Sequence, residues 1–108
     1  MNGQGPAVPP VVIERLLQLT ADVAPNVRVA AIRALGDLDA AATPAVIDRL
    51  LALTSDDDPD VRSAAIGALA KLGAAATPTV VQRLLALTHD ADPRVRVAAI
   101  KALAAFYR

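Results

Sequence analysis

The stretch PNVRVAAIRAL (25–35) decides the fold, because it returns with few changes as PDVRSAAIGAL (59–69) and as PRVRVAAIKAL (93–103). Each copy begins 34 residues after the one before it. A fixed period of this length is typical of a stacked array, in which each unit packs only on its neighbours. The quoted motif therefore marks one half of a repeating unit.

The other half of each unit begins at a proline and carries apolar residues at i, i+1, i+4, i+5 and i+7. This spacing makes one broad stripe on a helix. We expect helices over about 10–20, 44–54 and 78–88, each followed by a second helix on the quoted motif. One set of arginines lies off the stripe and is expected to reach solvent: Arg15, Arg49 and Arg83.

The turns between the paired helices are short, so the partners must run antiparallel. No stretch of β-branched residues with a period of two remains. The sequence therefore predicts an all-α fold, an α-solenoid (an alpha-alpha superhelix) of three antiparallel helical hairpins with a 34-residue period. We expect a flexible leader over 1–9 and a single repeat domain over 10–108, with repeats 10–43, 44–77 and 78–108.

Most helix starts carry a side-chain cap followed by proline. Thr43 and Thr77 precede the first helices of the second and third repeats, and Asp58 and Asp92 precede the second helices. Proline is tolerated next because the N–H at that position has no acceptor within the helix. In the first repeat Ala24 replaces the aspartate, which loses a cap worth about 1 kcal/mol.

Two glycines stand out in the second helices. Gly36 falls near a helix end, where glycine is common as a C-cap. Gly67 falls in mid-helix, where it costs roughly 1 kcal/mol relative to alanine. Gly36 is therefore expected to end its helix, and Gly67 to weaken one.

The composition narrows the class of function. Of the 108 residues 55% are hydrophobic and 2% aromatic, so Ala, Leu, Val and Ile must fill the core. Eleven basic residues balance eleven acidic ones, whereas nucleic-acid binders usually carry a basic excess. No cysteine is present, and no apolar run approaches the roughly 18 residues of a membrane span. We expect a cytoplasmic protein with no membrane partner and no nucleic-acid partner.

The motif, with an aspartate three residues before its proline, resembles the HEAT-like repeat family. Within that family it looks like the short bacterial form of the repeat, which also occurs in phycobilisome bilin lyases and in artificial repeat scaffolds. The resemblance implies a solenoid whose first helices form the convex side and whose second helices line the concave side. Between the first two repeats 22 of 34 aligned positions are identical, which suits recent amplification or consensus design.

In every repeat an aspartate stands six residues before the arginine of the motif. It can bond that arginine or the arginine of a neighbouring repeat, and it can also accept backbone N–H groups at the helix start. We expect a structural Asp–Arg ladder that fixes the register between repeats; anion binding would need arginines without partners. The ladder consists of Asp22, Arg28, Asp56, Arg62, Asp90 and Arg96.

The acidic run over 56–60 raises the alternative of a calcium site. It lacks the Asp-x-Asp-x-Asp-Gly spacing with a distant Glu, and helix capping accounts for its acids. His89 is the only histidine, and no serine nucleophile stands in a recognisable setting. We therefore expect no catalytic, metal or cofactor site and no enzymatic activity.

Positions that differ between the repeats fall at spacings of three and four on the second helices, and so on one face. A fixed framework with one variable stripe is typical of a binding surface on a solenoid, although exposed positions also drift freely. The predicted concave binding stripe consists of Asn26, Val29, Arg33, Asp37, Asp60, Ser63, Gly67, Lys71, Arg94, Val97, Lys101 and Ala105.

The last repeat keeps the apolar pattern of an internal unit, and its final helix ends in Leu103, Phe106 and Tyr107. Repeat arrays need polar terminal faces for solubility. We therefore expect a homo-oligomer that associates through this uncapped repeat, most simply as a two-fold dimer.

The sequence thus predicts a non-catalytic scaffold for protein–protein interaction or self-assembly. The similarity of its repeats also fits an engineered or amplified repeat array. The main alternative is a subunit or fragment of a bilin-lyase-like HEAT-repeat protein. Duplex DNA binding is a third reading, against which the charge balance argues.

Overall fold

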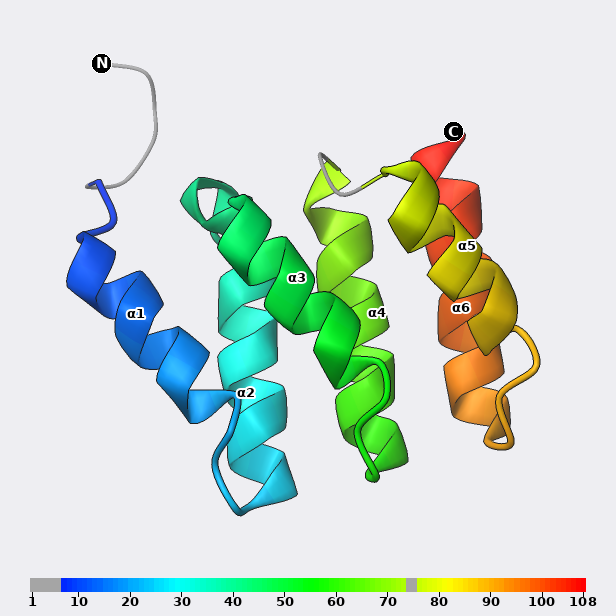
Figure 1. Cartoon of the computed structure of the whole chain (residues 1–108), viewed down its shortest axis with the longest axis horizontal. Coiled ribbons are helices and arrows are strands. Elements are labelled where there is room, and N and C mark those ends of the chain that lie inside the picture. The colour runs from blue at the N-terminus through cyan, green and yellow to red at the C-terminus, as the bar shows by residue number, and fades with distance from the viewer. Residues whose placement is uncertain (1–6, 74–75) are drawn as a thin grey trace.

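The computed structural model describes residues 7–73 and 76–108, so most of the predicted leader (1–9) lies outside the described residues. Over these ranges the chain forms helices and no strand (Figure 1), which confirms the predicted all-α fold. The α-helices are α1 (Pro10–Leu19), α2 (Pro25–Gly36), α3 (Pro44–Leu53), α4 (Pro59–Lys71), α5 (Pro78–Leu87) and α6 (Pro93–Phe106). A short 3-10 helix, η1 (Asp39–Ala41), joins the first repeat to the second and has no counterpart in the sequence prediction.

Every α-helix begins at a proline, and the predicted caps lie at the expected ends. The Thr43 hydroxyl accepts the N–H of Val46, 3.4 Å away. The Asp58 carboxylate accepts two backbone N–H groups of α4, at 2.8 and 3.4 Å. Pro9 and Ala24, at the starts of α1 and α2, provide no such bond. The first repeat is therefore the least well capped.

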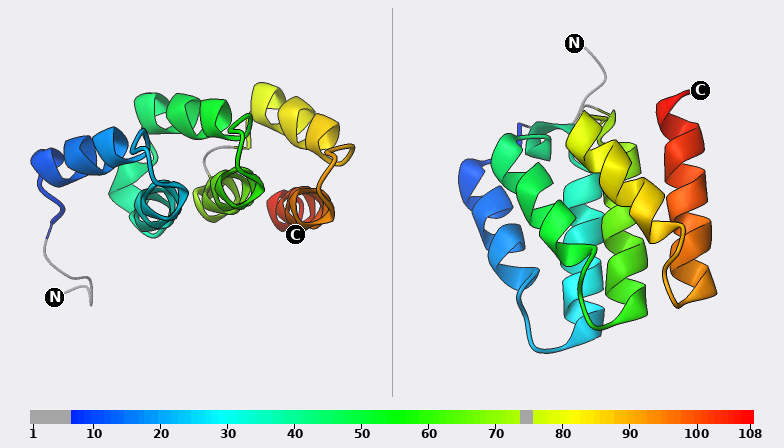
Figure 2. Two further views of the ribbon diagram at one scale, coloured as in Figure 1. Left: turned by 90° about the horizontal axis from the view of Figure 1, so that it is seen from below. Right: turned by 45° about the vertical axis from the view of Figure 1, so that its right-hand side comes forward.

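The helices form two layers (Figure 2). One layer, the A layer, contains α1, α3 and α5; the other, the B layer, contains α2, α4 and α6. The closest backbone packing between repeats joins α2 to α4 and α4 to α6. The A helices are spread along a longer arc than the B helices, which places the B layer on the inner side of the curve. This is the arrangement of an α-solenoid.

The core lies between the two layers. Ile32, Leu50, Ile66, Leu69 and Leu84 are fully buried there. The B helices turn alanines toward each other, and small side chains allow helix axes to approach closely. Within the described ranges, no helix combines the length and the apolar character that a bilayer span requires.

Gly36 lies at the end of its helix, as expected, but it is not the C-cap. Gly36 is the last helical residue of α2, and the cap that follows is Asp37 in right-handed helical conformation. A Cβ atom at Gly36 would lie 2.9 Å from both the Cα and the Cβ of Ala68 on α4. The glycine is needed because α2 and α4 approach each other at this point, not because the chain turns.

Candidate functional site

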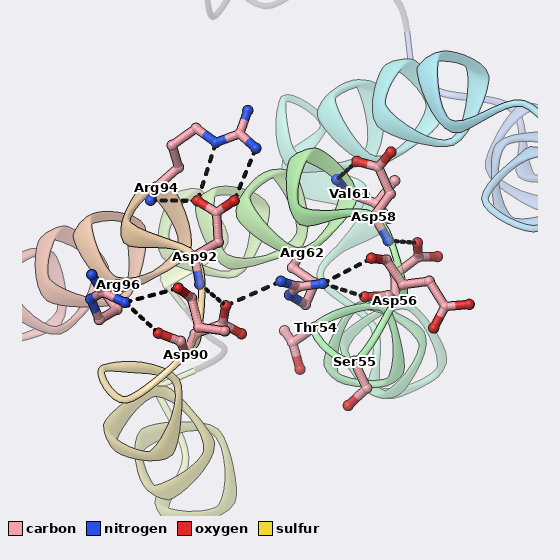
Figure 3. Close-up of polar contacts among 12 residues, drawn as sticks. Thr54, Ser55, Asp56, Asp58, Val61, Arg62, Asp90, Asp92, Arg94 and Arg96 are labelled. Atoms are coloured by element: carbon pink, nitrogen blue, oxygen red, sulfur yellow. Dashed lines mark hydrogen bonds and ion pairs between the residues drawn. The ribbon is translucent and has the colours of Figure 1, made fainter.

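The Asp–Arg ladder joins each repeat to the next one (Figure 3). The Nη2 atom of Arg28 donates to Oδ1 of Asp56 at 3.1 Å, and Arg62 makes the same bond to Asp90 at 3.1 Å. The side chains of these pairs are between 13% and 17% exposed. The sequence left it open whether each arginine pairs within its own repeat or with the neighbouring one. The structure places the carboxylate of the following repeat against Arg28 and Arg62.

The same guanidinium also holds the turn of its own repeat. Nη1 of Arg62 donates to the carbonyl oxygens of Asp56 and Asp57, at 2.9 and 3.1 Å. Arg28 and Arg96 make the equivalent bonds in their own turns. Arg28 and Arg62 each therefore bridge their own A-to-B turn and the turn of the following repeat, whereas Arg96 holds only its own turn.

The ladder carboxylates are also bonded to their own backbone. Oδ1 of Asp90 accepts the N–H of Asp92 at 2.9 Å. This bond is the main cause that lowers the pKa of Asp90, and the Arg62 guanidinium lowers it further. The carboxylate thus stays ionised, which keeps the contact between the second and third repeats charge-assisted.

A second contact between repeats, from an arginine to a threonine of the preceding repeat, was not predicted from the sequence. The Nε atom of Arg49 donates to the hydroxyl of Thr20 at 2.9 Å, and Arg83 does the same to Thr54 at 3.0 Å. Both threonines are fully buried, and both arginines are half-buried. The prediction that Arg49 and Arg83 reach solvent is therefore wrong. The recurrence of Thr and Arg on the 34-residue period was the signal that could have revealed this contact.

Three of the four aspartates in the run 56–60 have partners for their side chains. Asp56 belongs to the ladder, Asp58 caps α4, and Asp60 accepts from Nη1 of Arg94 at 2.9 Å. Among the residues that the structure describes, no group of three or more His, Cys, Asp or Glu side chains could hold a metal ion. Capping and pairing account for the acidic run.

A groove of about 980 Å³ lies between α2 and α4, on the side of the B layer turned away from α1 and α3. Every member of the predicted binding stripe from the first two repeats lines it. The members from the third repeat lie farther along the B layer, on α6: Arg94, Val97, Lys101 and Ala105. We call this cavity the B-layer groove.

The B-layer groove has a floor of small side chains and charged ends. Ala64, Gly67 and Ala68 supply the floor on the α4 side. At one end Nζ of Lys71 donates to Oδ1 of Asp37 at 2.7 Å. This pair is well exposed and so contributes little to stability. A bound segment could therefore come close to the helix backbone at the floor of the groove, with charged side chains at the ends of the groove.

Arg33 is the free charge of the groove. It lines the groove from α2 and is exposed, and in the described part of the chain it forms no ion pair. By contrast Asp60 is paired with Arg94, and Lys71 with Asp37. The groove therefore has one positive charge that is not neutralised.

The predicted self-association residues lie differently from expectation. Leu103 and Phe106 are half-buried and pack against the core, while Tyr107 is exposed. Besides Tyr107, the large apolar residues that the last repeat exposes are Ile100, Leu85 and Val97, at 58%, 52% and 48%. Aligning the repeats would have revealed Ile100, because the two equivalent residues in earlier repeats are core residues.

The comparison with known families agrees with this geometry. The family model described as HEAT repeats matches residues 13–104, nearly the whole chain. No curated protein matches the chain as a relative. The match spans all three hairpins, the two layers and both inter-repeat contacts. The chain belongs to the HEAT-repeat family.

Proposed function

We propose that the protein is a non-catalytic scaffold that binds a segment of a partner protein in the B-layer groove. One observation carries this proposal. The residues that stay constant between repeats build the core and the inter-repeat contacts, whereas the variable positions of α2 and α4 line the groove above a floor that includes the constant Ala64 and Ala68. HEAT repeats typically mediate protein–protein interaction, and solenoids use their inner surface for it.

The lining indicates what the partner carries. Gly67 has no heavy atom within 4 Å of its absent Cβ, so a partner segment can come close to the α4 backbone there. Val29 and the alanines beside it favour an apolar side chain at the same place. Arg33 favours a carboxylate nearby. We therefore infer that the occupant is a peptide segment with a central apolar residue and at least one Asp or Glu.

Selection of peptides from a random displayed library tests this proposal without a known partner. We expect the selected peptides to be enriched in acidic residues and to bind the protein at micromolar affinity. Gly67→Trp fills the groove without a clash, because nothing lies near its Cβ. It should weaken binding at least about tenfold, since the indole occupies the volume that the peptide needs.

The matched control is Ala52→Trp, an equally exposed substitution on the A layer. It should leave the affinity unchanged. Arg33→Glu should weaken acidic peptides and favour basic ones, because the free charge changes sign. If the selected peptides bind the Gly67→Trp variant as tightly as the unchanged protein, the groove is not the binding surface and the proposal fails.

A further inference from the structure

We propose that copies of this chain stack head to tail, with the open face of α5 and α6 in one copy against the open face of α1 and α2 in the next. This inference goes beyond the proposed function, since it uses the two ends of the solenoid and none of the groove floor. It rests on a correspondence between the ends. Each end presents one half of the contact that already joins the repeats within the chain.

The Asp–Arg ladder is incomplete at both ends. Arg96 holds its own turn through the carbonyls of Asp90 and Ala91, as the other ladder arginines do, but no carboxylate of the described residues reaches its Nη2. At the other end, the Asp22 carboxylate accepts the N–H of Ala24 at 2.9 Å and forms no ion pair with an arginine of the described part. Arg96 of one copy and Asp22 of the next are thus the donor and the acceptor of one further rung.

The Thr–Arg contact is also open at both ends. Thr88 makes the same bond to its own helix as Thr54 does, 2.6 Å to a backbone carbonyl, and it has no arginine beside it in the described residues. Arg15 occupies the position equivalent to Arg83 and is exposed; within the described residues it bonds only Gln18 of its own helix, at 3.0 Å. Stacking brings Arg15 to Thr88, as Arg83 lies against Thr54.

The apolar surfaces of the two ends correspond in the same way. Ile100 is 58% exposed, whereas the equivalent Ile32 and Ile66 are fully buried by the repeat that follows them. Val12 is 40% exposed, whereas the equivalent Val46 is fully buried by the repeat before it. A second copy would bury both end residues in the environment that their equivalents already occupy, and burial of apolar area favours the contact.

The charges favour a head-to-tail contact over the two-fold dimer expected from the sequence. In a two-fold dimer of C-terminal faces the two Arg96 guanidinium groups would meet on one surface, and each Asp22 would stay without an arginine. Like charges that face each other across an interface oppose association. A head-to-tail contact does not close on itself, so it generates open chains of copies.

Sedimentation of the full chain over a wide dilution series tests the proposal. We expect the average mass to rise steadily with concentration, through dimer and beyond, with no plateau at the dimer. High salt should reduce it, because the new rung is an exposed ion pair until the faces meet. Asp22→Arg and Arg96→Asp should each reduce association at least about tenfold, since each gives both ends of the chain the same charge.

Mixing these two variants is the decisive measurement. The mixture should regain association, because every contact between unlike variants pairs an arginine with an aspartate. Circular dichroism of each variant checks that it remains folded. Ile100→Glu, at an exposed position that bears no structural bond, should abolish stacking even where a ladder variant unfolds. Ala52→Glu on the A layer is its control and should have no effect.

Three results would overturn the proposal. The first is a monomer at every concentration. The second is a closed dimer that Asp22→Arg leaves intact, which identifies the two-fold contact instead. The third is a pair of folded variants that do not associate when mixed.

Discussion

Two glycines of the B layer should respond in opposite directions to the same substitution. Gly67 lies in the middle of α4, is exposed, and has nothing within 4 Å of its absent Cβ. Gly67→Ala should therefore gain the helix propensity of alanine, about 1 kcal/mol. For a domain of this size that gain raises Tm by roughly 4–8 °C.

Gly36→Ala should destabilise the protein instead. Its new methyl group would lie 2.9 Å from the Cα and the Cβ of Ala68, where carbon atoms normally approach to about 3.5–4.0 Å. The helices α2 and α4 must then separate, and overpacking of this kind costs about 1–3 kcal/mol. The gain in propensity offsets about 1 kcal/mol of that cost, which leaves a net loss of up to about 2 kcal/mol.

Urea unfolding followed by far-ultraviolet circular dichroism measures the free energy of unfolding of both variants, which we expect to differ by about 1–3 kcal/mol. Ala68→Gly in the Gly36→Ala background removes one of the two clashing atoms, so the double variant should be more stable than additivity predicts. If Gly36→Ala proves as stable as Gly67→Ala, the contact between α2 and α4 is not as close as we describe, and the reasoning is refuted.

Other predictions concern the caps, the ladder and the groove. Ala24→Asp should raise the free energy of unfolding by about 1 kcal/mol, because Ala24 has nearly the backbone angles of Asp58 and lacks only its carboxylate. Asp58→Ala should lower it by a similar amount, and thermal unfolding measures both variants. The pKa of Asp90 is lower in the folded chain than its ordinary value of 3.8. The ionised Asp90 carboxylate therefore stabilises the fold fully above pH 3.8, and this stabilisation is lost as the pH falls through the folded pKa. Unfolding midpoints measured against pH should therefore decline in acid, and less steeply for Asp90→Asn. The Ser63 hydroxyl is buried without a hydrogen-bond partner in the described residues, so Ser63→Ala should raise stability by about 1 kcal/mol, and an equal or lower urea midpoint would contradict this.

The sequence by itself determined where the helices lie. Proline at each start, Thr43 and Asp58 as caps, and an apolar period near 3.6 are local signals, and they act within a few residues of the chain. The predicted starts and layers therefore agree with the structure. The 34-residue period also determined that the hairpins stack, because no hairpin can bury its apolar face alone.

The tertiary structure alone decided which residues meet across the repeats. Arg62 can reach an aspartate in its own turn or in the next, and only the distance between the B helices selects Asp90. The same distance gives Gly36 its role and leaves Ile100 open at the end of the stack. Such contacts depend on the distance between two packed helices. The spacing of residues along a single helix does not predict that distance.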